Sequence, residues 1–526
     1  MENGYLAIIL HAHLPFVRHP EYADSLEENW LYEAMTETYI PLLLVLEDLL
    51  NGGVDFRLTF SLTPTLASMF QDPLLQSRYL QRLESLIGLT GREIRRTEMQ
   101  PEFQSLARFY RQRLRQVRAA FVRHYKKDLI ESFRRFQESG KVEIIASAAT
   151  HGYLPLLSPN ASAVRAQILV GIEHYERLFG IRPKGFWLPE CGYYSGVDGF
   201  LRDQGIQYTV VETHGITRAD PRPRYGVYAP ICCPTGVAVF GRDPESSKQV
   251  WSSTEGYPGD YDYREFYRDI AYDLDLDYIR PYIHTDGIRI DTGIKYYRIT
   301  GKGDHKEIYV PEWAEKKAEI HAGNFIFNRE RQVEYLASEM RRKPVIVAPY
   351  DAELFGHWWY EGPLWLHHLL RKIAKDQKTI RLITLSEYLE EFPVNQVSVT
   401  CPSSWGHEGF SEVWLSGKND WIYPHLHWAA TKMEKLAQDH PQGHKLMQRA
   451  LNQATRELML AQGSDWAFMM HGGAMTEYAT KRLKTHLLRF YRLCQAIDEG
   501  MIDNEWLARV ESLDNIFPHI QYQSFF

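Results

Sequence analysis

Short apolar runs alternate along the chain with longer segments whose apolar residues recur at helical spacing. We expect strands at residues 6–10, 56–60, 142–146, 185–188, 208–211, 237–240, 345–348 and 380–384. Strands that alternate with helices indicate a parallel sheet of the α/β class. Because these units repeat over most of residues 1–395, we expect the sheet to close into a barrel.

Two segments depart from this alternation. Residues 65–140 are rich in Arg, Gln, Leu and Glu and have almost no strand pattern, which predicts a helical insertion between two strands. Their basic run at 108–127 is interpreted as a solvated helix face, with a polyanion-binding surface as the alternative. Amphipathic runs at 427–453 and 476–499 predict helices again. We therefore expect a barrel at 1–395 and a helical C-terminal domain at 396–526.

Composition narrows the class of protein. The formal charge of -7 comes from 60 basic and 67 acidic residues that are mostly interleaved, which argues against a nucleic-acid partner. No apolar stretch approaches the ~18 residues of a membrane span, and the apolar start of the chain is interpreted as a strand instead of a signal peptide. Five scattered cysteines without a C-x-x-C pair favour a reducing compartment, so we expect a cytoplasmic protein.

Aromatic residues make up 13% of the chain, with 13 Trp and 32 Tyr. Flat rings that stack on the apolar faces of sugars are one reason for such a content. A large core with tyrosines at its rim is the other interpretation, and composition does not separate the two.

Acidic residues follow two of the predicted strands. Glu190 lies in Gly185-Phe-Trp-Leu-Pro-Glu-Cys-Gly-Tyr193, and Asp351 lies in Ala348-Pro-Tyr-Asp-Ala-Glu-Leu-Phe-Gly-His-Trp-Trp-Tyr-Glu-Gly362. Loops at the carboxyl ends of parallel barrel strands share one face, so we expect the two carboxylates to meet there. Cleavage of a glycosidic bond needs such a pair, one ionised and one protonated. The structural alternatives are an arginine-paired Glu190 and a helix-capping Asp351.

Histidines accompany the carboxylates. His11 and His13 alternate after the first strand, and His151 follows the third. Together with nearby acids they could hold a metal ion, as in metal-dependent deacetylases and mannosidases that begin in a similar way. Neutral imidazole both donates and accepts, so it suits a sugar hydroxyl equally well. We favour sugar binding and predict no metal.

Taken in order, four motifs resemble those of a known family. They are His11-Ala-His-Leu-Pro15, the two carboxylate motifs above, and Ser403-Ser-Trp-Gly406 followed by Glu412-Val-Trp414. This set resembles glycoside hydrolase family 57, and most closely its 1,4-α-glucan branching enzymes. The resemblance covers nearly the whole chain. It implies a (β/α)7 barrel with a helical insertion and a helical C-terminal domain that closes the active-site cleft.

The resemblance also implies a chemistry. Glu190 matches the family's nucleophile and Asp351 its general acid/base, in a retaining mechanism without cofactor or metal. The expected activity cleaves α-1,4 bonds of amylose, amylopectin or glycogen and transfers the chain to a 6-hydroxyl; α-glucan is both donor and acceptor, and the oligomeric state stays open. We predict substrate contacts at His11, His13, His151, Trp187, Trp358, Trp405, Trp414, Asp465, Trp466, Arg264 and Phe240.

One stretch departs from the pattern of branching enzymes. Members commonly place a tyrosine near the tip of a mobile loop over the site, and the equivalent stretch, 229–250, contains none. Phe240 is its only aromatic residue, while Pro230, Pro234 and Gly236 mark a loop before it. An α-amylase or a 4-α-glucanotransferase on the same scaffold is therefore the alternative. A glucan-binding protein without activity is a third interpretation. Residues 257–264 are expected at the cleft rim, where Arg264 is a polar contact or a structural partner.

Overall fold

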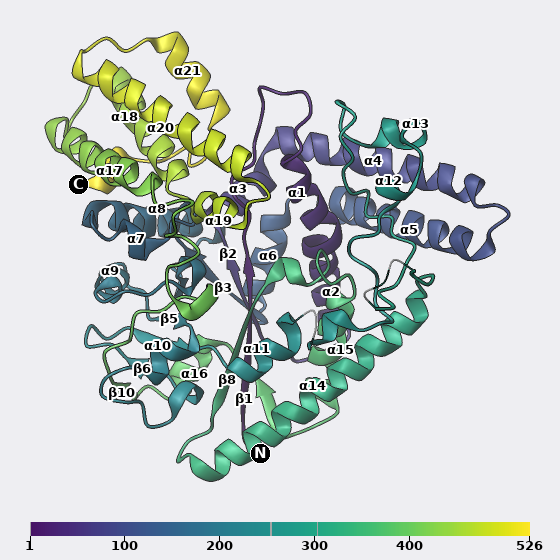
Figure 1. The fold of residues 1–526 in the computed structure, drawn as a ribbon. Helices are drawn as coiled ribbons and strands as arrows, with labels where there is room; N and C mark the ends of the chain where they lie inside the picture. Colours follow the sequence, from purple (N-terminus) through teal and green to yellow (C-terminus); the bar gives the residue numbers. More distant parts are fainter. Residues whose placement is uncertain (1, 253–254, 302, 304) are drawn as a thin grey trace.

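A curled parallel sheet forms the centre of the protein (Figure 1). The computed structural model describes residues 2–252, 255–301, 303 and 305–526. Within these residues, parallel strands follow one another in the order β8-β1-β2-β3-β4-β5-β7, which is the (β/α)7 barrel. They are β1 (Gly4–Ala12), β2 (Leu58–Leu62), β3 (Val142–Ser147), β4 (Gly185–Trp187), β5 (Tyr208–Val211), β7 (Ala238–Gly241) and β8 (Val345–Asp351).

Smaller contacts complete the barrel. Where β7 meets β8, the backbone N–H of Asp243 donates to the carbonyl of Val347 at 2.9 Å. Three short strands add to the sheet: β9 (Ile380–Leu382) pairs with the start of β1, β6 (Ile231–Cys232) runs antiparallel to β7, and β10 (Gln396–Val397) pairs with β6. Each of the eight predicted strand segments contains a strand, so this part of the prediction is confirmed.

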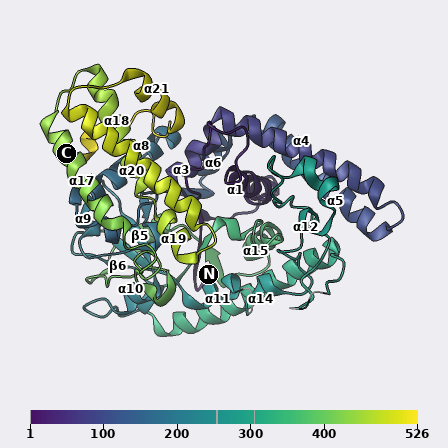
Figure 2. The same cartoon turned by 45° about the horizontal axis from the view of Figure 1, so that its top comes forward.

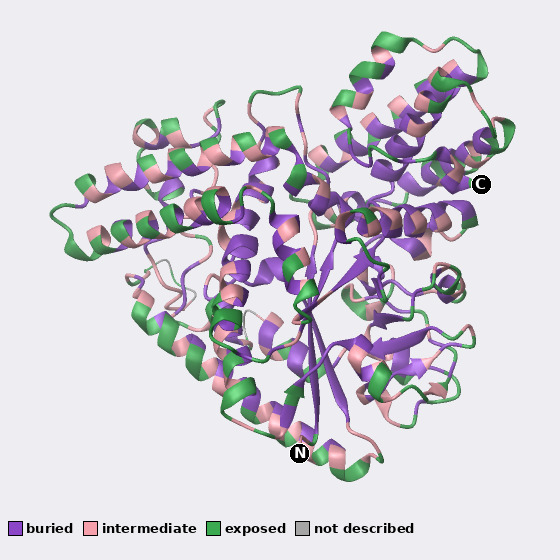
Figure 3. Ribbon diagram, turned by 180° about the vertical axis from the view of Figure 1, so that it is seen from behind, coloured by how far each residue is buried: buried purple, intermediate pink, exposed green. Residues whose placement is uncertain are grey.

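Strand β1 is buried on both faces, because helices cover the barrel from outside. Its residues Tyr5, Ala7 and Ile9 join the inner cluster, whereas Leu6, Ile8 and Leu10 pack outward against the helices. Figure 3 shows the strands as buried and the outward faces of the surrounding helices as exposed. The barrel interior is therefore a packed core, and ligands can approach only at its ends.

Helices between β2 and β3 occupy the predicted insertion. They are α3 (Pro64–Gln71), α4 (Pro73–Arg96), α5 (Pro101–Ala119) and α6 (Leu129–Glu138). Helices α4 and α5 form an antiparallel hairpin that extends away from the barrel (Figures 1 and 2). Asp72 caps α4, accepting from the N–H groups of Leu74 and Leu75 at 3.0 Å, and Pro73 occupies the first helical position, where it costs no hydrogen bond.

The other helices around the barrel follow its strands in turn. They are α1 (Glu28–Ala34), α2 (Ile40–Asn51), α7 (Leu154–Leu157), α8 (Ala161–Phe179), α9 (Val197–Asp203), α10 (Thr213–Thr217), α11 (Pro244–Trp251), α12 (Ile270–Asp273), α13 (Leu276–Ile279), α14 (Pro311–Glu339), α15 (Gly362–Lys375) and α16 (Leu385–Glu391). None of the helices in the described part of the chain is both long and apolar enough to cross a membrane.

The C-terminal region is helical beyond residue 421. Its helices are α17 (Ile422–Asp439), α18 (Lys445–Ala461), α19 (Ser464–Gly472), α20 (Thr476–Asp498) and α21 (Asn504–Leu513). The amphipathic run at 427–453 spans two helices: Pro441 and Gly443 separate α17 from α18, because proline lacks a backbone donor and glycine favours a turn. The N-terminus of α19 reaches the barrel, where the N–H of Ser464 donates to the carbonyl of His151 at 3.0 Å.

Candidate active site

A cleft of about 620 Å³ opens at the carboxyl ends of the barrel strands, between the barrel and the C-terminal region. Residues that follow β1, β3, β4, β7 and β8 line it from below, and residues from 405–414 and α19 line it from the side. The full lining is His11, His13, Leu14, His151, Glu190, Arg242, Trp251, Asp351, Glu353, Trp358, Trp405, Gly406, His407, Val413, Trp414, Asp465 and Phe468. The two predicted carboxylates therefore share one cavity.

Glu190 lies in a tight turn after β4. Its φ of 62° is in the left-handed region, which is strained for a residue with a side chain and is common at functional sites. Gly192 allows the turn to fit, since a Cβ there would lie 2.6 Å from the Tyr153 ring. The backbone N–H of Trp405 donates to the carbonyl of Glu190 at 3.0 Å. The turn is thus held by residues from two distant parts of the chain.

Each oxygen of the Glu190 carboxylate has one donor. The indole N–H of Trp405 donates to Oε2 at 2.8 Å, and the hydroxyl of Ser464 donates to Oε1 at 2.9 Å. Burial raises the pKa of Glu190, while these two hydrogen bonds and the nearby His13 act in the opposite direction. No arginine bonds to it within the described residues, so its surroundings are those of an oriented carboxylate and not of a structural ion pair.

Asp351 ends β8, in register with His11 of β1. No donor bonds to its carboxylate anywhere in the part of the chain that the structure describes, and it makes no capping hydrogen bond to the helical turn that follows. Burial raises the pKa of Asp351 well above its ordinary value, and the neighbouring charges of Glu353 and Glu190 raise it further, with Arg242 opposing. These surroundings favour the protonated acid.

The histidines pack as a group beneath the cleft. His11 Nε2 lies 3.0 Å from His151 Nε2, and His13 Nε2 lies 3.0 Å from the Asp465 carboxylate. Although burial opposes it, the charge of Asp465 raises the pKa of His13 overall. Burial lowers the pKa of both His11 and His151 well below the ordinary value, so these two rings are neutral.

His13 and His151, together with Asp465, also form a group that could in principle bind a metal ion. Donor atoms of His13, His151 and Asp465 lie within 4.8 Å of one another. The rings of His13 and His151, however, are stacked with centroids 3.7 Å apart and planes inclined by only 20°. An ion at the ~2.0–2.1 Å of a zinc–nitrogen bond cannot lie in the planes of two rings stacked in this way. The arrangement suits hydrogen bonding better than ligation.

Aromatic rings form the walls of the cleft. Trp405 bonds to Glu190, and Trp414 stacks on Tyr153 with centroids 4.4 Å apart. Across the cleft Trp358, which is 44% exposed, lies 6.0 Å from the ring of Trp251. Trp251, Trp358 and Trp405 keep part of their ring surface accessible and offer flat apolar faces to a sugar chain, whereas Trp414 is only 1% exposed.

Four of the predicted substrate contacts are not among the residues that line the cleft. Trp187 is fully buried and stacks behind His11, and Phe240 points into the barrel core against Tyr208. Trp466 is buried, its indole N–H bonded to the carbonyl of Leu460. The Arg264 guanidinium donates to the Glu37 carboxylate at 2.9 Å and does not line the cleft. This is the role of structural partner named for it above. These side chains are all buried in the packed interior, away from the cleft.

The stretch 229–250 also differs from the prediction. Instead of one loop it holds the antiparallel pair β6 and β7 and most of helix α11. Since β7 runs parallel to the other barrel strands, the turn containing Pro234 and Gly236 lies at its amino end, away from the cleft. Only Arg242 from this stretch lines the cleft, with Trp251 immediately after it.

Sequence reasoning missed several lining residues. Glu353 accepts from the backbone N–H of His13 at 3.1 Å and from the Tyr39 hydroxyl. Arg242 directly follows β7, where the rule that located Glu190 would also have found it. Ser464 precedes Asp465, which was predicted, but a serine carries little signal of its own.

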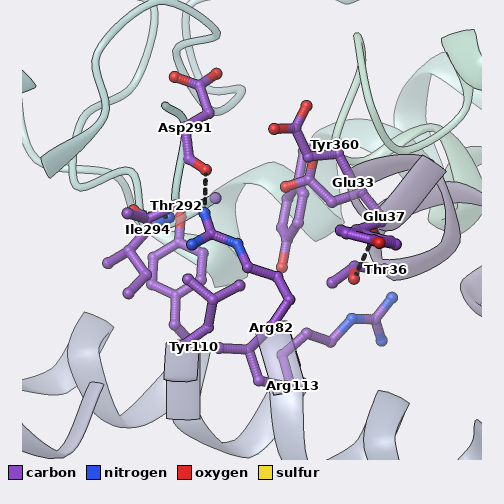
Figure 4. A pocket seen from close by; sticks show the side chains of 14 residues that line it. Glu33, Thr36, Glu37, Arg82, Tyr110, Arg113, Asp291, Thr292, Ile294 and Tyr360 are labelled. Atoms are coloured by element: carbon purple, nitrogen blue, oxygen red, sulfur yellow. Dashed lines mark hydrogen bonds between the residues drawn. The ribbon is translucent and has the colours of Figure 1, made fainter. Parts of the chain in front are cut away.

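A second, smaller cavity of about 40 Å³ lies apart from the cleft, between α1, α4, α5 and residues 291–294 (Figure 4). Glu33 and Glu37 face it from one side, and Arg82 and Arg113 from the other. This volume holds only a few water molecules, so the cavity is not a second substrate site.

A parallel barrel with two carboxylates of unlike environment in an aromatic-walled cleft defines an enzyme that cleaves glycosidic bonds. The sequence matches the description "Glycosyl hydrolase family 57" over residues 7–331, and "1,4-alpha-glucan branching enzyme, C-terminal" over 425–525. The chain belongs to glycosyl hydrolase family 57, as its motifs indicated.

Three proteins of known name are similar to the chain over nearly its whole length. A 1,4-alpha-glucan branching enzyme of Thermococcus kodakarensis is 33% identical over 98% of this chain and 77% of its own. The alpha-amylase AmyC of Thermotoga maritima is 44% identical, with a TM-score of 0.94 over 100% of this chain and 99% of its own. A family 57 branching enzyme of Pyrococcus horikoshii is 34% identical, with a TM-score of 0.90 over 100% and 97%.

Proposed function

We propose that the protein is a 1,4-α-glucan branching enzyme that uses Glu190 as nucleophile and Asp351 as general acid/base. The observation that carries this proposal is the pair of carboxylates in one cleft, one with two donors and one with none. When the surroundings of two carboxyl groups separate their pKa values, the group with the lower pKa takes the role of the ionised nucleophile and the other that of the acid. Similarity to the Thermococcus and Pyrococcus branching enzymes, and the match over 425–525, support the transfer reaction.

In the first step Glu190 attacks the anomeric carbon while Asp351 gives its proton to the departing glycosidic oxygen. A glucosyl-enzyme ester results. In the second step the Asp351 carboxylate takes the proton of a 6-hydroxyl on another glucan chain, and that oxygen displaces Glu190 to form an α-1,6 branch. A retaining mechanism predicts carboxyl groups ~5–5.5 Å apart.

The cleft walls fit an α-glucan such as amylose, amylopectin or glycogen as donor and acceptor. Trp358 and Trp405 supply stacking surfaces, while His13 and Asp465 supply polar contacts for hydroxyl groups. We assign Asp465 and Phe468 of α19 to a wall by which the predicted domain 396–526 closes the site. The described cysteines are all unpaired, which supports a cytoplasmic location.

A hydrolase is the second candidate. The 44% identity to the Thermotoga alpha-amylase favours it. Water and a 6-hydroxyl compete for the same intermediate, and transfer succeeds only when the acceptor is well held and water is excluded. A 4-α-glucanotransferase would instead deliver the chain to a 4-hydroxyl.

Incubation with amylose separates these outcomes. New reducing ends and new α-1,6 linkages, the latter read from the anomeric proton signals by NMR, are counted in the same sample. Branches in excess of reducing ends support the proposal. Reducing ends without branches identify an amylase, and redistribution of chain lengths with neither identifies a glucanotransferase. If Glu190→Gln leaves all products unchanged, the assigned nucleophile is wrong.

A further inference from the structure

A chain of hydrogen-bonding groups leads from the barrel to the catalytic carboxylate. Ser61 Oγ lies 3.1 Å from His11 Nδ1, and His11 Nε2 lies 3.0 Å from His151 Nε2. His151 Nδ1 lies 2.9 Å from Ser464 Oγ, which lies 2.9 Å from Glu190 Oε1. Ser61, His11, His151 and Ser464 are each at most 2% exposed, so solvent does not compete for these bonds.

The donors and acceptors along this chain follow from elementary chemistry. An ionised carboxylate only accepts, so the Ser464 hydroxyl donates to Glu190 and can accept only from His151 Nδ1–H. Because neutral imidazole carries one N–H, His151 Nε2 must accept, and His11 Nε2–H donates to it. His11 Nδ1 then accepts from the hydroxyl of Ser61. At each step only one assignment of donor and acceptor remains.

We propose that Ser464 is a positioning residue for the nucleophile, the last donor of a one-way hydrogen-bond chain that runs from Ser61 through His11 and His151 to Glu190. This inference rests on the proposed role of Glu190. The chain fixes the Nδ1–H tautomer of His151 and the Nε2–H tautomer of His11. It orients one carboxylate oxygen, Oε1, while the indole of Trp405 orients the other.

Backbone contacts make Ser464 suited to this task. Its own N–H donates to the carbonyl of His151 at 3.0 Å, and Gly152 and Gly463 form an antiparallel bridge beside it. The hydroxyl is therefore held to the barrel from both sides. Both donors to Glu190, Ser464 and Trp405, come from the region after residue 395, so the barrel alone does not complete its nucleophile.

Other charged groups also act on Glu190. The charge of Asp465 raises its pKa and that of His13 lowers it, while His151 Nδ1 lies 3.7 Å from Oε1. Asp351 and Arg242 face it across the cleft. Removal of the Ser464 hydroxyl subtracts one stabilising donor from this set, so the acidic limb of the pH profile must move upward.

The test compares Ser464→Ala with Ser464→Thr, which keeps the hydroxyl, and with Ser403→Ala as matched control. Ser403 is also buried, and its hydroxyl has no partner within the described residues.

The assay follows the fall in amylose–iodine absorbance, to which hydrolysis and branching both contribute. For Ser464→Ala we expect a kcat lower by about 10- to 100-fold, an unchanged KM, and an acidic limb of kcat/KM higher by about one pH unit. Ser464→Thr recovers the rate, and Ser403→Ala behaves as the wild type.

A wild-type rate and pH profile for Ser464→Ala overturns the inference. So does an equal loss in Ser464→Thr with the acidic limb unmoved, since the hydroxyl would then be irrelevant. Urea unfolding of each variant verifies that it is folded. A wild-type enzyme that leaves amylose unchanged would instead refute the proposed function.

A second readout does not depend on activity. Neutron diffraction from deuterium-exchanged crystals locates the exchangeable protons directly. We expect deuterium on His151 Nδ1 and on His11 Nε2, and none on His11 Nδ1. Deuterium on His151 Nε2 would break the chain at its centre and refute the inference whatever the enzyme does to amylose.

Discussion

Glu33 and Glu37 lie one helical turn apart and both face the small cavity of Figure 4, yet their pKa values are displaced in opposite directions. Burial raises the pKa of Glu33 from 4.5 to about 7, and no hydrogen-bond donor in the described part of the chain offsets it. For Glu37 burial acts in the same direction, but Arg264 at 2.9 Å and His357 outweigh it and hold the pKa at about 2.

These displacements convert into stability. The pKa of Glu33 is about 7 in the folded protein and 4.5 in the unfolded chain. Ionised Glu33 therefore destabilises the folded state by about 3 kcal/mol above pH 7, and this cost disappears as pH falls through 7 toward 4.5. Glu33→Gln is therefore expected to raise the free energy of unfolding by up to about 3 kcal/mol at pH 8 and to have no such effect near pH 4.5. For Glu37 the sign is reversed: its ionised form stabilises the fold above pH 4.5, and this is lost only as pH falls through about 2. Glu37→Gln is expected to destabilise by a similar amount at pH 8, because Arg264 loses its partner.

Urea unfolding followed by tryptophan fluorescence measures both variants, at pH 8 and at pH 4.5. The wild type at each pH is the reference, and the two neighbouring substitutions control for each other because they remove the same charge from the same cavity. If Glu33→Gln is neutral or destabilising at pH 8, or if both substitutions shift the unfolding midpoint in the same direction, the pKa argument is wrong.

Three further predictions concern the cleft. Glu190→Gln and Asp351→Asn are each expected to lower kcat on amylose by at least about 10³-fold, and a residual rate within tenfold of the wild type for either would remove it from the mechanism. Trp405→Phe keeps a ring but removes the donor to Glu190 Oε2, so we expect kcat to fall about tenfold and the acidic limb of kcat/KM to rise; an unmoved limb would mean that the indole N–H does not matter. Dialysis against EDTA is expected to leave the rate unchanged, whereas loss of activity restored by added zinc would revive the metal interpretation of His13 and His151.

Sequence patterns predicted the parts of the fold that follow from local rules. The segment 208–211 coincides with β5, and Glu190 and Asp351 were found because polar residues at the carboxyl ends of parallel strands converge. The role of each carboxylate stays a prediction, as does the boundary at residue 395. The failures have a common cause: Phe240 and Trp187 alternate into the barrel core, and alternation in a strand buried on both faces is not visible in hydrophobicity alone.

Partners distant in the chain were beyond sequence reasoning. Arg264 bonds to Glu37, which lies more than two hundred residues away in the sequence. A positive charge next to tyrosines does not indicate whether its partner is a ligand or an acidic side chain. The same holds for Ser464, whose importance comes entirely from the 2.9 Å contact with a residue of the barrel. Such contacts depend on tertiary packing, which periodicity does not record.

The two donors of the Glu190 carboxylate have a consequence for biosynthesis. Translation makes Glu190 before Trp405 and Ser464, so a nascent barrel lacks the complete pair of donors to this carboxylate until residue 464 has been made. A chain that stops before residue 464 therefore lacks at least one of the two hydrogen bonds that orient the Glu190 carboxylate.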